Sequence, residues 1–317
     1  MTAWAALDWT RLRRTMKLGL ACACLLLMPA EAFAARVALV LSDDSAPYQE
    51  VYQVVRAYLD DSGHEISRIY AGNLNASALG DARLAVAVGV RAAESLAALP
   101  VRPPVLAVLV PRAWYLKTGR ARLGEGGRRS ASAIYLDQPF DRQAQLIHLA
   151  FPDIRRVGVL LSAEQGNLVG EIDEALRTQR LSPVHGTLTG EERLITPLEN
   201  VLSEAELLLA VPDPLVFNRN TAQSLFLTSY RYRDPVLGYS RSLTRAGALL
   251  SLHSSPAQIG RQTAEWVSQA IQAMPVRLPA PAYPLYFSVS INEQVARSLG
   301  FNLPSEAELE RRLGGGG

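Results

Sequence analysis

The pentapeptide GYSRS at residues 238–242 comes nearest to a catalytic motif in this sequence. It approaches the G-x-S-x-G nucleophile elbow of serine hydrolases, in which Ser240 would attack an ester or amide carbonyl. The closing position holds Ser242 instead of glycine, and its Cβ would crowd the strand-to-helix turn. His253 and Asp213 are the available triad partners, but Asp213 precedes the serine, an order that the hydrolase pattern does not use. A serine hydrolase using Ser240 therefore ranks third among the functions considered.

Metal and phosphate sites lack their usual spacings. The histidines form no i, i+4 pair and no H-E-x-x-H motif, which argues against a zinc site. The basic, glycine-rich stretch LKTGRARLGEGGRR, within residues 112–130, lacks both the G-x-x-x-x-G-K-[ST] pattern and the following helix that would cradle a phosphate. We therefore predict a mobile surface loop there, and neither a metal nor a cofactor.

Asp213 offers a carboxylate at the end of the apolar run ELLLAV. It precedes Pro214, which favours the first position of a helix, so the carboxylate can accept the first free amides as a cap. It could equally receive an ammonium or hydroxyl group from a ligand. Both interpretations stay open at this stage.

The elements that position these side chains alternate between short apolar runs and helical patterns. Between Glu206 and Ile271 the runs ELLLAV, PVLGY and ALLSLH predict buried strands of a mostly parallel sheet. The last helix starts with a capping box, because Ser255 and Gln258 flank Pro256 at the right spacing. From Arg36 the runs VALVLS, HEISRIY, LAVAVGV and PVLAVLV repeat the alternation. Ligands bind such α/β sheets at the carboxyl ends of the strands.

Length and composition indicate an exported protein of two lobes. The 317 residues exceed an average domain, 49% of them are hydrophobic, and the net charge of +2 is too balanced for a nucleic-acid footprint. An apolar segment ending in A-F-A predicts a signal peptide over residues 1–34, with Met1 or Met16 as the start, and hence a periplasmic location. Both cysteines, Cys22 and Cys24, lie in that segment and lack the preceding aliphatic residue of a lipoprotein signal.

The region from residue 211 to 267 carries a series of short motifs. They stand as Val216-Phe217, Thr228-Ser229-Tyr230, Pro235-Val236, Gly238-Tyr239-Ser240, Ala246 to Leu249 and Pro256 to Gln262. In these motifs the chain resembles the periplasmic substrate-binding proteins of ABC transporters, specifically the group with tryptophan- and tyrosine-binding members. The likeness extends from Arg36 to about Pro304.

The resemblance implies an α/β type I periplasmic-binding fold, with two doubly wound lobes joined by three hinge crossings. The crossings are expected near Tyr135–Asp137, Tyr239–Ser240 and Tyr283–Ser288. The first lobe would then comprise residues 35–136 and 240–284, and the second lobe residues 137–239 and 285–304. Residues 305–317 are expected to form a flexible tail.

Two departures from the family pattern bear on the ligand. Family members commonly carry glycine and a small hydroxyl residue after the third strand, and Asp-Pro after the fourth. This chain has Gly89-Val90-Arg91 and Pro111-Arg112 instead. Both arginines would face the cleft, where the planar guanidinium can grip a carboxylate with two hydrogen bonds. An acidic or larger ligand is the preferred interpretation.

Lobe closure over a solute requires strand-end loops, a few convergent polar groups and aromatic rings for stacking. The candidate ligand-binding residues are Ser42, Asp43, Arg91, Arg112, Trp114, Tyr135, Asp137, Asn167, Asp213 and Tyr239. Each also has a structural interpretation: the arginines as surface residues, Trp114 as a loop cover, and Tyr135 and Tyr239 as hinge packing.

The sequence therefore predicts a monomeric, non-enzymatic solute-binding protein. It would deliver a small molecule, amino-acid-like or carboxylate-bearing, to an inner-membrane ABC permease. The second-ranked function is a periplasmic ligand sensor or interaction protein of the same fold. No nucleic-acid partner is expected.

Overall fold

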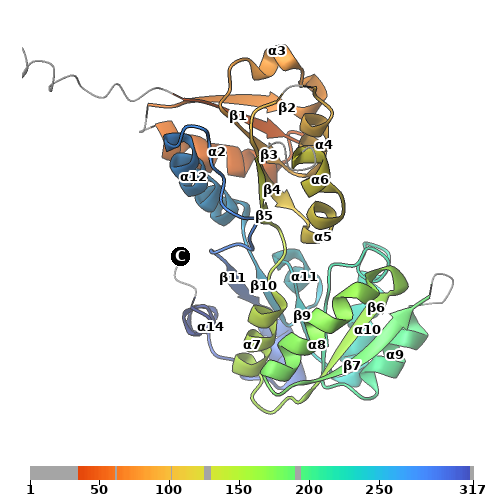
Figure 1. Cartoon of the computed structure of the whole chain (residues 1–317). Coiled ribbons are helices and arrows are strands. Elements are labelled where there is room, and N and C mark those ends of the chain that lie inside the picture. Colours follow the sequence, from red (N-terminus) through yellow and green to blue (C-terminus); the bar gives the residue numbers. More distant parts are fainter. Residues whose placement is uncertain (1–34, 61–62, 101, 125–129, 190–193, 315–317) are drawn as a thin grey trace, which may run out of the picture. The chain divides into compact units, whose positions relative to one another are not determined.

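A computed structural model describes residues 35–60, 63–100, 102–124, 130–189 and 194–314. The predicted signal peptide lies outside the described residues. From Arg36 onward the chain forms one compact unit, which contains two separate β-sheets (Figure 1). In the part of the chain that is described, no helix combines the length and the apolar character needed to cross a bilayer.

The first sheet has the strand order β2-β1-β3-β4-β5, and all of its neighbouring strands are parallel. Its central strands are runs of valine, leucine and alanine with both faces covered, as expected for a parallel sheet between helices. The strands are β1 (Arg36–Leu41), β2 (Glu65–Tyr70), β3 (Leu84–Val88), β4 (Val105–Val110) and β5 (Ala131–Tyr135).

Helices cover both faces of this sheet, and together they form the first lobe. Helices α2 (Ala46–Asp60) and α12 (Pro256–Gln272) pack together on one face, where Gly260 allows α12 to approach Val51 and Val54 closely. Helix α4 (Val90–Ala97) lies on the other face (Figure 1). The short η1 (Ala71–Asn73) and α3 (Ala76–Leu79) follow β2. The predicted capping box of α12 is confirmed, because Ser255 Oγ and the Gln258 side chain each accept a backbone N–H of the other residue.

The predicted surface loop at residues 112–130 is wrong over residues 112–124. These residues form α5 (Arg112–Trp114), a π-helical turn η2 (Tyr115–Gly119) and α6 (Arg120–Gly124). Tyr115, Gly119 and Leu123 recur every four residues, and Tyr115 and Leu123 are buried in the core of the first lobe. This spacing provides an apolar helical face that outweighs the low helix propensity of glycine.

The second sheet has the order β11-β10-β9-β8-β6-β7, with only β11 antiparallel to its neighbour. Its strands are β6 (Arg156–Ser162), β7 (Ser182–Leu188), β8 (Leu207–Leu209), β9 (Val236–Gly238), β10 (Leu250–His253) and β11 (Ser288–Ile291). They carry the core of the second lobe.

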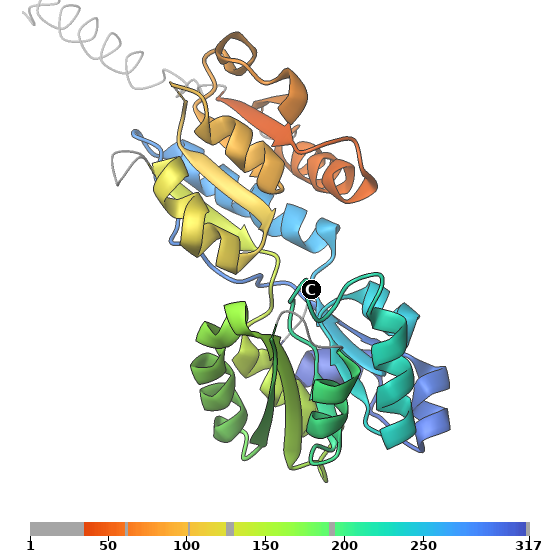
Figure 2. The same cartoon turned by 90° about the vertical axis from the view of Figure 1, so that its right-hand side faces the viewer.

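The helices of the second lobe also lie on two faces. Figure 2 shows α7 (Phe140–Ala150) and α8 (Val169–Thr178) on one face, with α9 (Ile195–Leu202) and α10 (Ala222–Tyr232) on the other. The second lobe also contains η4 (Ala163–Leu168), α11 (Arg241–Ala246) and α13 (Glu293–Leu299). Separate apolar clusters fill the two faces.

The chain passes between the sheets three times. It leaves β5 for α7 through residues 136–139, returns from β10 to α12 through residues 254–255, and leaves the first sheet again after Ala282, which bridges Ile134 beside β5. The predicted second crossing at Tyr239–Ser240 is wrong, because β10 pairs with β9 in the second sheet. The segment 241–253 therefore belongs to the second lobe, and α12 with the chain up to Ala282 belongs to the first.

The predicted flexible tail is a helix over most of its described part. Helix α14 (Glu306–Arg312) is capped by Ser305, and Leu309 is fully buried in the core of the second lobe. Glu306 and Glu310 accept the backbone N–H groups of Ile291 and Val289 at 2.7 and 2.8 Å. These carboxylates satisfy the outward amides of the edge strand β11.

Candidate functional site

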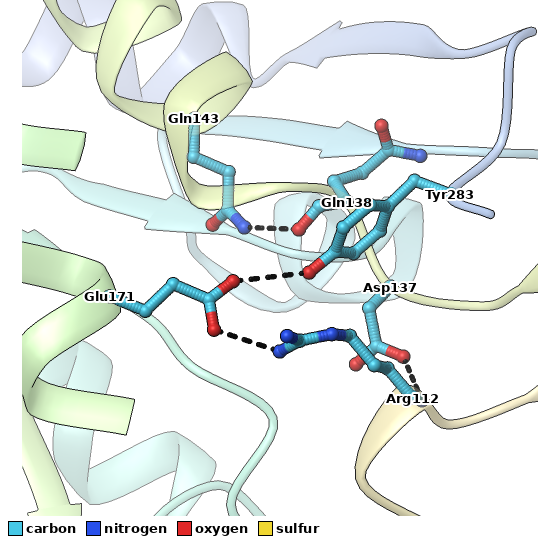
Figure 3. A network of polar contacts seen from close by, with 6 residues as sticks. All are labelled: Arg112, Asp137, Gln138, Gln143, Glu171 and Tyr283. Carbon is cyan, nitrogen blue, oxygen red and sulfur yellow. Dashed lines mark hydrogen bonds and ion pairs between the residues drawn. The ribbon is translucent and has the colours of Figure 1, made fainter. Parts of the chain in front are cut away.

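The carboxyl ends of β4 and β5 bring two predicted site residues together. Arg112 follows β4 after one residue, and Asp137 follows β5 after one residue. The backbone N–H of Arg112 donates to Asp137 Oδ2 at 2.6 Å, so the carboxylate fixes the start of α5 (Figure 3). Burial raises the pKa of Asp137, while the hydrogen bond from Arg112 opposes that rise. The two residues form the base of a polar network.

The Arg112 side chain extends this network to the second lobe. Its Nη1 donates to Glu171 Oε2 at 2.8 Å, and Glu171 Oε1 accepts the Tyr283 hydroxyl at 3.3 Å (Figure 3). Glu171 comes from the first turn of α8, and Tyr283 from the third crossing. Burial alone would lower the pKa of Arg112, but Tyr283 and Glu171 outweigh it and the net pKa is raised. The arginine is therefore a permanent cation.

Three tyrosine rings form an aromatic wall beside Arg112. The Tyr135 ring lies 5.9 Å from that of Tyr115 and 5.4 Å from that of Tyr283, between centroids. The Arg112 guanidinium lies over Tyr283, 5.6 Å from its ring centre. Burial raises the pKa of Tyr115 to about 12 and raises the pKa values of Tyr135 and Tyr283 as well. All three phenols are therefore neutral at physiological pH.

A second group of predicted residues lies at the carboxyl ends of β1 and β3. Ser42 is buried, and its Oγ donates to the Val88 carbonyl and accepts the Ala92 N–H, so it ties β1 to the start of α4. Asp43 is exposed, and hydrogen bonds from Ser45 lower its pKa, with Arg91 adding to the effect. Arg91 is exposed in the first turn of α4. Asp43 and Arg91 can reach a solute, whereas Ser42 positions the backbone.

The third group belongs to the second lobe. Asp213 is 1% exposed, and its carboxylate accepts the N–H groups of Ser162 at 2.7 Å and Leu215 at 3.0 Å. This geometry supports the interpretation that Asp213 accepts free backbone amides. The amides belong to the end of β6 and to the turns at residues 214–221, because α10 begins only at Ala222. Tyr239 packs edge-on against Phe217, with ring centres 6.1 Å apart, and burial raises its pKa.

The two remaining candidates lie apart from these groups. Asn167 is exposed in η4. The Trp114 ring covers Gly119, where a Cβ would come within 2.7 Å of it, and its Nε1 donates to Glu94 at 3.4 Å. The structure therefore supports the interpretation of Trp114 as a cover over its own segment.

Sequence reasoning missed Glu171 and Tyr283. Glu171 lies in the first turn of α8, where an acidic residue is favoured by the helix dipole and needs no further explanation. Tyr283 was placed in a crossing but was not counted as a site residue. Neither carried a local signal, because their shared contacts join positions 59 and 112 residues apart in the chain.

The three crossings are joined by one set of side-chain contacts, which we call the hinge clasp. Gln138 donates from Nε2 to Ser254 Oγ at 2.8 Å, and Ser254 donates to the Tyr286 carbonyl at 2.6 Å. Arg142 donates both to Gln138 Oε1 and to the Pro284 carbonyl, at 2.6 and 3.0 Å. Residues from all three crossings thus share a single hydrogen-bonded chain.

Each residue of the possible serine hydrolase triad has hydrogen-bond partners outside the triad. Ser240 Oγ caps α11 by accepting the Leu243 N–H, and it contacts Ser242 Oγ at 2.9 Å. His253 is hydrogen-bonded to Ser290 Oγ at 2.9 Å, and both oxygens of Asp213 accept backbone amides. Across the described residues, no group of three or more His, Cys, Asp or Glu could hold a metal ion.

Two surface depressions lie elsewhere in the second lobe. One, of about 800 Å³, is lined by β7 and α9. The other, of about 680 Å³, lies between α10 and α11 and is mainly apolar. Neither is lined by Arg112 or by the residues of its network, so the network is identified by its chemistry and by its place at the strand ends.

Comparison with known proteins supports the fold. No protein family profile matches the sequence, and no curated protein matches it. Among solved structures, a ligand-free, open substrate-binding protein with adhesive properties from Clostridium difficile aligns with a TM-score of 0.69 at 16% identity, covering 86% of this chain and 96% of that one. A conserved domain protein from Vibrio cholerae aligns with a TM-score of 0.59 at 18% identity, covering 88% and 98%.

A third structure, an ABC domain from Streptococcus pneumonia in complex with L-Trp, aligns with a TM-score of 0.55 at 16% identity, covering 86% and 96% of the two chains. The predicted fold class is thus confirmed: the chain has the α/β type I periplasmic-binding fold. Of these three structures, one is described as a substrate-binding protein and one as a complex with L-Trp.

Proposed function

We propose that this protein is an extracytoplasmic solute-binding protein that captures a small molecule between its two lobes and delivers it to an ABC importer. The observation that carries the proposal is the meeting of charged and aromatic groups from both lobes and a crossing at Arg112, Glu171 and Tyr283. Such convergence at the carboxyl ends of parallel strands is how this architecture forms ligand sites. The shared fold with a substrate-binding protein supports the same role.

The proposed ligand site consists of Arg112, Tyr135, Asp137 and Tyr283, with Asp43 and Arg91 on the rim of the first lobe. Arg112 provides a fixed cation for a carboxylate, and the partly exposed Tyr283 ring, which packs against the buried Tyr135 ring, provides a surface for an apolar or aromatic group. Asp137 provides a partly buried carboxylate that can accept an ammonium group. An amino acid or another carboxylate-bearing molecule fits this combination, and the L-Trp complex of a protein with the same fold is consistent with it.

A thermal-shift screen of amino acids, small carboxylates and cofactor fragments tests the proposal. A ligand that binds only the folded protein raises Tm as the ligand concentration increases. At a ligand concentration of one hundred times Kd, the free energy of unfolding increases by about 2.7 kcal/mol. We expect a hit whose effect is lost in Arg112→Gln. The matched control is Arg277→Gln, an exposed arginine outside the network. A hit that turns over during incubation would instead favour an enzyme.

A further inference from the structure

The ion pair between Arg112 and Glu171 uses only part of the guanidinium. It is a single hydrogen bond from Nη1 to Oε2, and the other carboxylate oxygen of Glu171 is used by Tyr283. Within the described residues, Nε and Nη2 of Arg112 have no hydrogen-bond partner. A guanidinium binds a carboxylate best through two parallel N–H groups. Glu171 therefore leaves the Nε–H and Nη2–H donors of Arg112 available to a second carboxylate.

Arg112 has two contacts that do not involve Glu171. Its backbone N–H is held by Asp137 at 2.6 Å, and its guanidinium rests over the Tyr283 ring. The side chains of Arg112 and Glu171 are 28% and 39% exposed, so water and small solutes reach both. An incoming carboxylate can thus replace Glu171 while the cation stays in place and stays neutralised.

We infer that Glu171 is a built-in competitor for the ligand carboxylate. In the ligand-free protein it occupies Arg112 and links α5 of the first lobe to α8 of the second. A ligand that carries a carboxylate displaces it by binding Arg112 through two hydrogen bonds, whereas an uncharged analogue of the same shape does not. Glu171 is then a specificity-determining residue, and this inference rests on the proposed function.

The test uses the full chain, with sodium benzoate as the carboxylate probe and benzamide as its uncharged analogue. Binding is followed by the ¹H–¹⁵N signals of the arginine Nε–H groups, with the Arg112 signal assigned by its loss in Arg112→Gln. Glu171→Gln removes the competing charge but retains an oxygen acceptor. We expect it to bind benzoate about two- to fivefold more tightly than the wild-type chain, the range typical of a partly exposed ion pair. Benzamide should show no such gain.

Glu293→Gln is the matched control, because Glu293 pairs with Arg297 at 3.9 Å on the exposed face of α13, away from Arg112. It should leave benzoate affinity unchanged. The inference is overturned if benzoate does not shift the Arg112 signal in Glu171→Gln, or if Glu171→Gln and the wild-type chain bind benzoate equally. A screening hit that binds wild-type protein independently of Arg112 and Glu171 would also overturn it while supporting the proposed function. If benzoate binds Glu171→Gln more tightly than the wild-type chain but the screen finds no ligand, the inference about Glu171 is supported and the proposed function is not.

Discussion

Replacing Asp213 by alanine should destabilise the protein even without ligand. The substitution removes both acceptors from the N–H groups of Ser162 and Leu215. Ser162 is 2% exposed, so its amide is left buried and unpaired, at a cost of about 1–3 kcal/mol that increases because the lost acceptor is charged. Leu215 is 48% exposed, and water can replace part of its lost bond. The expected loss is therefore about 2–4 kcal/mol.

Urea unfolding of the ligand-free protein measures this loss directly, and differential scanning calorimetry should show Tm lowered by roughly 3–7 °C. Asp44→Ala, at an exposed carboxylate, is the control and should change stability by less than about 0.5 kcal/mol. The alternative, in which Asp213 grips the ligand, predicts lost binding with a free energy of unfolding within about 0.5 kcal/mol of wild type. That outcome would refute the assignment of Asp213 as a buried cap.

Three further changes test other parts of the structure. Burial raises the pKa of Asp234 to about 7, so the folded state binds this proton more tightly than the unfolded state does. The free energy of unfolding should therefore fall as pH rises from about 4 to 7. In Asp234→Asn, urea unfolding should show this fall reduced by about 1–3 kcal/mol. Gly89→Ala should cost about 2–3 kcal/mol in the same assay, because φ is +90° and the new Cβ would lie 2.5 Å from Ser42 Oγ; a cost below about 0.5 kcal/mol would contradict the geometry. Gln138→Ala should break the hinge clasp and broaden the distribution of interlobe distances, measured by double electron–electron resonance between spin labels. An unchanged distribution would show that the clasp does not restrain the lobes.

Features set by neighbouring residues could be predicted from the sequence. The capping box at Ser255 follows from three side chains within one turn, and the central strands β1, β3 and β4 of the first sheet follow from continuous apolar runs. The helical segment after β4 was also encoded, in the four-residue spacing of Tyr115, Gly119 and Leu123. It was missed because the glycines and basic residues around it were interpreted as a loop.

Features set by distant contacts could not be predicted. The run ALLSLH is equally suited to either sheet, and only its pairing with β9 and β11 places it in the second. The site shows the same limit. The resemblance points to Arg112, as a departure from the family pattern after the fourth strand, and to Asp137, in the expected first crossing, but nothing in the sequence pairs Arg112 with Glu171 or Asp213 with the Ser162 amide. Those pairings depend on how α8 and β6 are placed by the fold.

Helix α14 has a consequence for how copies of this chain meet. An edge strand with unsatisfied amides is a template on which another chain can add a strand. Glu306 and Glu310 imitate the carbonyl oxygens that such a strand would offer to Ile291 and Val289. Helix α14 thus blocks the addition of a further strand at β11, and we expect a chain shortened ahead of residue 306 to aggregate more readily.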